Sequence, residues 1–278
     1  MLIAKLNETR YRVDPDWASL PPGVAFTNVS DVCAGPRGKI YVLQRSDPFM
    51  LVLSSAGKLL VSWRNATITD GHYVTCAPNG NLCVIDRDNH RIVVLDDSGR
   101  VIRTIGDDPA RGLVGPFNHP TDVAYAGNGD MFVSDGYGNT RVHRLEAAGE
   151  VLLAWGTPGA GPGEFSTPHS VAIDERERVW VADRENNRLQ VFTMDGAFVM
   201  EVLNVQRPMK VHASGSLVYV TDQVPSLMVF DLDGNRLGRC RTRGMYGHGL
   251  GVDGEKSIYV AEMNPDGLTK FVPVSGDL

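Results

Sequence analysis

Three of the seven histidines in the chain, His72, His169 and His248, occupy the same position of a recurring sequence pattern. Each stands two residues before the valine or leucine that marks the first apolar segment of a repeat. The pattern occurs six times, and histidine takes this position in the second, fourth and sixth copies. Three neutral imidazole nitrogens beside an open fourth position form the donor set of a catalytic zinc site. Imidazole also suits iron, copper or nickel, so the pattern predicts a transition metal, with zinc favoured.

A second set of polar residues follows the next apolar segment of the repeat. Directly after the polar end of that segment stand Arg45, Arg87 and Arg184 in three of the copies. A planar guanidinium binds both oxygens of a carboxylate, so Arg45 and Arg184 are candidate catalytic and substrate-binding residues. For Arg87 and Arg184 the alternative is a structural ion pair between neighbouring repeats, and we interpret Arg87 in that way.

Tyr137 is a further candidate, in the segment Ser-Asp-Gly-Tyr-Gly-Asn at residues 134–139. The flanking glycines favour a loop that can lean over the centre of the molecule. A phenol placed there can act as a general base or as a metal ligand. The alternative is an aromatic side chain that packs between two repeats.

The elements that must position these residues are short strands. In residues 168–199, apolar segments of four to seven residues alternate with turns, and Asp195-Gly196 is a hairpin signal. One copy is therefore a four-stranded antiparallel sheet. Six sheets with two apolar faces each bury one another when they pack radially, which predicts an all-β, six-bladed β-propeller. The first-strand markers are Val32, Val74, Val123, Val171, Val211 and Leu250.

The ring needs a closing strand. The sixth copy ends after residues 269–273 without a good fourth strand, whereas Thr9–Val13 alternates like a strand and precedes the first copy. We expect this N-terminal strand to complete the sixth sheet. No linker or block of charge divides the sequence, so residues 1–278 are interpreted as one propeller domain. First strands lie innermost in a propeller, and the three histidines should therefore meet at the axis.

Composition narrows the class of protein. The chain has 27 Lys and Arg against 33 Asp and Glu, a net charge of −6, and no basic run, which argues against nucleic acid as the main partner. No window approaches the ~18 unbroken apolar residues of a membrane span. The N-terminus shows no secretory signal. The cysteines form no CxxC pair and are interpreted as free thiols in a reducing, cytoplasmic setting: Cys33, Cys76, Cys83 and Cys240.

On these residues the chain resembles NHL-repeat propellers and, more specifically, peptidyl-α-hydroxyglycine α-amidating lyases. The specific likeness is strongest over residues 117–201 and rests on the segments Pro-Thr-Asp-Val-Ala (120–124), Ser-Asp-Gly-Tyr (134–137), Pro-His-Ser (168–170) and Val-Ala-Asp-Arg-Glu-Asn (181–186). The resemblance implies zinc on the three histidines, with Tyr137, Arg45 and Arg184 in the active site. It also implies a carboxylate-bearing small-molecule or peptide-like substrate, an N-acyl carbinolamine cleaved to an amide and glyoxylate or a related oxo product.

Three positions depart from that family. An aspartate that binds a structural calcium follows the third histidine in the family, and Gly249 stands there in this chain. This argues against calcium, although backbone carbonyls near Val74 remain available as ligands. Tyr246 replaces a family methionine and is a candidate substrate-binding residue in a reshaped pocket. The disulfide cysteines of secreted members are missing, with Gly138 at one of these places.

Two other functions fit a six-bladed propeller. A lactonase-type metallohydrolase would use a divalent cation on the axis, but such sites are rich in Asp, Glu and Asn rather than histidine. A non-catalytic NHL interaction module would have a metal-free axis. The register of the three histidines is the feature that favours the lyase over the interaction module.

Overall fold

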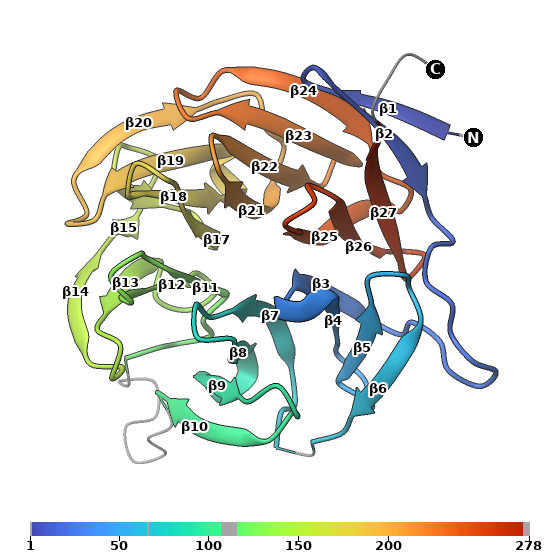
Figure 1. The fold of residues 1–278 in the computed structure, drawn as a ribbon. Coiled ribbons are helices and arrows are strands. Elements are labelled where there is room, and N and C mark those ends of the chain that lie inside the picture. Colours follow the sequence, from blue (N-terminus) through green and yellow to red (C-terminus); the bar gives the residue numbers. More distant parts are fainter. Residues whose placement is uncertain (1, 66, 107–115, 275–278) are drawn as a thin grey trace.

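Six antiparallel sheets stand around one axis in the computed structural model, which describes residues 2–65, 67–106 and 116–274 (Figure 1). The predicted all-β, six-bladed propeller is confirmed. Blade 1 contains β3 (Val29–Ala34), β4 (Lys39–Gln44), β5 (Met50–Ser54) and β6 (Leu59–Trp63). Blade 2 contains β7 (Gly71–Cys76), β8 (Leu82–Asp86), β9 (Arg91–Leu95) and β10 (Val101–Ile105). Blade 3 contains β11 (Asp122–Tyr125), β12 (Met131–Asp135), β13 (Arg141–Leu145) and β14 (Val151–Trp155).

The second half of the ring repeats this order. Blade 4 contains β17 (Pro168–Ile173), β18 (Arg178–Asp183), β19 (Arg188–Thr193) and β20 (Phe198–Val202). Blade 5 contains β21 (Pro208–Ser214), β22 (Leu217–Asp222), β23 (Ser226–Asp231) and β24 (Arg236–Arg241). Blade 6 contains β25 (Tyr246–Val252), β26 (Ile258–Met263) and β27 (Gly267–Val274). Between blades 3 and 4, β15 (Thr157–Pro158) and β16 (Glu164–Phe165) form a short parallel pair.

The N-terminal segment closes the ring as predicted. β2 (Thr9–Asp14) pairs antiparallel with β27, from Arg10 opposite Val274 to Asp14 opposite Lys270. A preceding strand, β1 (Leu2–Leu6), was not predicted and forms a hairpin with β2. Leu6 and Tyr11 from this hairpin are buried in the cluster that joins blades 5 and 6. Figure 1 shows the hairpin beside the strands of both blades.

The core lies between the blades rather than within any one of them. Six clusters of buried apolar side chains are found among the described residues, and each joins two adjacent blades. Several fourth strands end on a side chain that packs against the hairpin glycine of the next blade. Trp63 packs in this way on Gly99, and Trp155 on Gly196. Both glycines have positive φ and leave no space for a Cβ, which explains their recurrence in the repeat.

Removal of residues 1–14 should open the ring. It deletes the fourth strand of blade 6 and the buried Leu6 and Tyr11, whose burial is worth about 1.5–3 kcal/mol each. We expect the melting temperature to fall by about 10 °C and the bare edge of β27 to promote association, as measured by thermal melting and light scattering. Deletion of residues 1–6 keeps β2 and serves as the control with a smaller effect. A variant lacking residues 1–14 that is as stable and monodisperse as the parent would contradict this closure.

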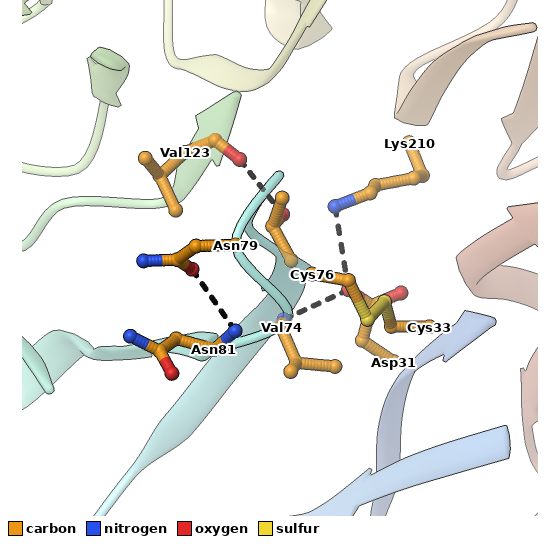
Figure 2. The surroundings of a disulfide bond; sticks show 9 residues. Asp31, Cys33, Val74, Cys76, Asn79, Asn81, Val123 and Lys210 are labelled. Atoms are coloured by element: carbon orange, nitrogen blue, oxygen red, sulfur yellow. Dashed lines mark hydrogen bonds and ion pairs between the residues drawn. A yellow bond between two sulfur atoms is a disulfide. The ribbon is translucent and has the colours of Figure 1, made fainter. Parts of the chain in front are cut away.

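The expectation of four free cysteines is wrong for two of them. Cys33 at the end of β3 and Cys76 at the end of β7 form a disulfide between the inner strands of blades 1 and 2 (Figure 2). Cys83 and Cys240 are free. The pair was missed because its members are 43 residues apart and form no local motif. The interpretation of a reducing setting loses its main support. In the described part of the chain, no helix has the length and apolar character needed to cross a membrane.

Candidate metal centre

One hydrogen-bond pattern recurs in all six blades and fixes where each inner strand begins. The side chain at the end of the second strand accepts a backbone N–H from the loop that leads into the first strand. In blade 2, Asp86 Oδ1 accepts from Thr69 N at 3.1 Å and from Asp70 N at 3.2 Å. Sequence reasoning used these polar residues only as strand markers, although their constant spacing was a signal for this role. The other acceptor and donor pairs are Gln44–Thr27, Asp135–Asn118, Asp183–Ser166, Asp222–Gln206 and Glu262–Arg243.

The structure brings the three predicted histidines together on the axis. His72, His169 and His248 come from β7, β17 and β25, and all three side chains are buried. One ring nitrogen of each lies within 4.8 Å of the others. The ring centroids are 4.9, 5.1 and 5.5 Å apart. Alternate blades therefore deliver three imidazoles to one point, as the repeat register predicted.

The hydrogen bonds of the second ring nitrogen determine the tautomer. His72 Nδ1 lies 2.7 Å from the carbonyl oxygen of Thr121, and His169 Nδ1 lies 2.8 Å from that of Met209. His248 Nδ1 lies 2.7 Å from the carbonyl oxygen of Ser30. Because a carbonyl only accepts, each Nδ1 carries the proton and each Nε2 presents a lone pair. Each acceptor belongs to the next blade, so the ring orients all three imidazoles, as outer partners do at metal centres.

Electrostatics keeps these imidazoles neutral. Burial, followed by His169 and Arg45, holds the pKa of His72 well below its usual range. Burial, followed by Arg184, lowers the pKa of His169. Burial, followed by Arg45, lowers the pKa of His248. Neutral imidazole is the form that binds a metal ion. The donor set, its tautomers and its burial fit a transition metal such as zinc, which three histidines with an open position can hold.

Tyr137 reaches the histidines from the loop after β12. Its hydroxyl oxygen lies 2.9 Å from His169 Nε2 and 3.3 Å from His72 Nε2, and Arg184 Nη1 donates to it at 3.1 Å. The neighbouring Gly136 has a different role from the expected one. A Cβ there would overlap the Pro168 carbonyl, so close approach of two backbones requires the glycine.

The arginines form a cluster around this phenol. Arg45 Nη2 lies 3.2 Å from His248 Nε2, and its Nε donates to Ser30 Oγ at 3.1 Å. Arg87 forms ion pairs with Asp70 at 2.7 Å and with Asp88 at 2.9 Å, as a structural residue should. Its guanidinium also lies 5.2 Å from the centroid of the Tyr137 ring. Arg87 therefore borders the site more closely than the sequence indicated.

Two residues of the site escaped the sequence analysis. Asp70 pairs with Arg87 and also lies 3.7 Å from Arg45 Nε, which joins two of the arginines. Tyr73 is fully buried directly beneath the histidines, and its hydroxyl oxygen lies 2.8 Å from the carbonyl oxygen of Met209 and 2.9 Å from that of His248, so its single hydrogen is donated between them. Tyr73 follows His72 and belongs to the next ring of repeat positions. A comparison of the residues at this position in all six copies could have identified Tyr73.

The surface beside the centre offers room for a substrate. A cavity of about 530 Å³ opens next to Arg45 and Gly71, with Phe49 and Ile68 as apolar walls. Tyr246 lies at the start of β25, two residues before His248, and is partly exposed. Among the described residues, no hydrogen bond or ring contact joins Tyr246 to the three histidines. Its predicted role in substrate binding stays a prediction.

Comparisons with known proteins agree with this architecture. The model of the NHL repeat matches residues 165–192, which include β17, β18 and most of β19 in blade 4. The chain carries an NHL repeat in blade 4 of its propeller. It is 27% identical to NHL repeat-containing protein 3 of Homo sapiens, over 95% of this chain and 85% of that protein. It is 26% identical to peptidyl-alpha-hydroxyglycine alpha-amidating lyase 1 of Drosophila melanogaster, over 94% of this chain and 54% of that protein.

Solved structures share the fold of this six-bladed propeller. A gluconolactonase from Xanthomonas campestris superposes with a TM-score of 0.72 and 15% identity, over 98% of this chain and 92% of that one. At this identity the likeness concerns the fold alone.

Proposed function

We propose that this protein is a zinc-dependent carbon–nitrogen lyase that cleaves N-acyl carbinolamines of the α-hydroxyglycine type to an amide and glyoxylate or a related oxo product. The observation that carries the proposal is the convergence of three Nε2 lone pairs beneath a phenol to which an arginine donates. The similarity to an amidating lyase over most of the chain supports the same reaction class.

The reaction needs a proton transfer but no oxidant. The hydroxyl group of the carbinolamine loses its proton, and the oxygen electron pair forms the new C=O bond. The C–N bond breaks, its electron pair stays on nitrogen, and the nitrogen takes up a proton to give the amide. A zinc ion bound by the three histidines would polarise the hydroxyl oxygen as a Lewis acid. Tyr137, within hydrogen-bond distance of two of these histidines, would take the proton and return it to nitrogen.

The arginines complete the site. Arg184 holds the Tyr137 oxygen, and Arg45 lies against His248, so two guanidinium groups border the histidines. A guanidinium binds the two oxygens of a carboxylate with parallel hydrogen bonds, and the glyoxylate half of the substrate carries such a group. The acyl half then has the cavity beside Arg45 and Ile68 available to it.

The test combines metal analysis with an assay. Protein purified without chelator should contain about one zinc ion per chain, the capacity of one three-histidine site. It should convert N-benzoyl-α-hydroxyglycine to equal amounts of benzamide and glyoxylate, and lose this activity when the metal is removed. Gluconolactone serves as the second substrate. Lactone opening without glyoxylate release would replace the lyase by a lactonase, and a metal-free, inactive protein would favour an interaction module.

A further inference from the structure

A buried ionic layer lies on the axis directly below the histidines, and the proposed reaction does not use it. Its members occupy the repeat position just after that of the histidines. Lys210 Nζ lies 2.8 Å from Asp122 Oδ1 and 3.3 Å from Asp31 Oδ2, and all three side chains are buried. Figure 2 shows the Lys210 amine directed at Asp31 in the centre of the ring. The ammonium also lies 4.0 Å from the centroid of the Tyr73 ring, a favourable cation–π position.

The two carboxylates are held in place by groups other than the ammonium. Asp31 accepts backbone N–H bonds from Val74 at 3.0 Å and from Leu250 at 3.1 Å. Asp122 accepts from Ser170 Oγ at 2.6 Å and from Val171 N at 3.2 Å. The inner strands of several blades thus fix a rigid set of oxygen atoms around the axis. Carboxylate oxygens fixed in this way are the donors that calcium prefers.

The residues present do not fit a bound calcium. The family aspartate that would bind it is Gly249 here, and a Cβ at Gly249 would overlap Cα and Oδ1 of Asp31 and lie 2.8 Å from the Ser30 carbonyl oxygen. The close approach of β25 to β3 therefore excludes any side chain at position 249. Burial alone would lower the pKa of Lys210, but Asp122 and Asp31 outweigh it and raise that pKa, so the amine stays charged.

We propose that the Lys210 ammonium takes the place of a structural divalent cation in this propeller, and that removing it uncovers an oxygen-lined calcium site formed by Asp31 and Asp122. One charge of the chain itself thereby compensates two buried carboxylates that would otherwise require an ion from solution. The layer is reached from the end of the channel opposite to Tyr137. A cavity of about 130 Å³ there is lined by Lys210, His212 and the disulfide cysteines.

The experiment measures melting temperature with and without calcium. The parent protein should melt at the same temperature in millimolar calcium and in calcium-free buffer. Lys210→Met leaves two carboxylates buried without a cation, and should lower the melting temperature by about 10 °C in calcium-free buffer. Millimolar calcium should restore about half of that loss or more, because the ion binds only the folded state. This measurement does not depend on catalysis or on the proposed reaction.

The matched control is the double variant Lys210→Met/Asp122→Asn. It has the same net charge in the layer as the parent but one carboxylate fewer, so it should not respond to calcium. A parent whose melting temperature rises with calcium, or a Lys210→Met variant that calcium does not stabilise, would overturn the proposal. If Lys210→Met does not fold, Lys210→Gln replaces it. Failure of both variants to fold even in calcium also counts against the proposal, since calcium should then replace the ammonium.

Discussion

His169→Ala should yield a folded propeller that no longer retains its metal and no longer cleaves carbinolamine substrates. The side chain would supply one of the three ligands of the proposed metal, and its Nε2 lies 2.9 Å from the Tyr137 hydroxyl oxygen. Removing a residue that only hydrogen-bonds to a metal ligand already lowers metal affinity by about 10–100-fold. Removing a ligand itself should therefore lower metal affinity by more than about 100-fold. His169 lines the axis and takes no part in the apolar clusters between blades, so the fold should persist. Elemental analysis, the glyoxylate assay and circular dichroism measure the three outcomes.

The control for this variant is His143→Gln. His143 is also buried, but its Nε2 contacts Asp135 at 3.1 Å, away from the trio. Blade 4 already carries glutamine at the equivalent place, where Gln190 donates to Asp183. His143→Gln should therefore keep metal and activity. If His169→Ala retained full metal content, the assignment of the metal centre would be wrong, and an insoluble variant would show that the histidine or its metal is needed for folding.

Tyr137→Phe should separate metal binding from chemistry. The hydroxyl group is removed while the three histidines and their Nδ1 hydrogen bonds remain, so metal content should not change. Loss of a positioned acid or base typically lowers the rate by about 10²–10⁴, and we expect kcat to fall in that range. KM should change far less, because the arginines proposed to bind the substrate carboxylate are retained.

A suitable control is Tyr125→Phe, which removes a hydroxyl group hydrogen-bonded to Cys83 between blades 2 and 3, outside the site. Its kcat should equal that of the parent. Arg87 is unsuitable as a silent control because it lies over the Tyr137 ring. Near-parental kcat in Tyr137→Phe would move the acid–base role from the phenol to an arginine or to a metal-bound hydroxide.

Most of what the sequence predicted about the fold and the site came from comparing equivalent positions of the six repeats. Equivalent positions in a propeller are related by rotation about the axis, so the alternation of His72, His169 and His248 translates directly into convergence at one point. The closing strand was predictable because a six-bladed ring with one incomplete sheet has an unpaired edge, and Thr9–Asp14 was the segment able to cover it.

The features that were not predicted depend on contacts between residues at different positions of the repeat. Asp70 contacts both Arg45 and Arg87 from a loop that is held in place by hydrogen bonds to Asp86. Comparison of equivalent repeat positions does not predict this contact. The Cys33–Cys76 disulfide requires knowledge of how neighbouring inner strands are offset. β1 lies outside the repeat and could not be inferred from it.

The seam between β2 and β27 has a mechanical consequence. Arg10 faces Val274 at one end of the pair and Asp14 faces Lys270 at the other, and Leu2 at the start of β1 lies opposite Val13. A force that pulls the two termini apart therefore first peels β1 from β2, beginning at Leu2 and Val13, and then reaches Arg10 and Val274. The backbone hydrogen bonds open one after another instead of being loaded together in shear. Blade 6 should unzip at low force. Blades 1 and 2 resist longer, because the disulfide between Cys33 and Cys76 keeps the 43-residue span between them from being drawn out.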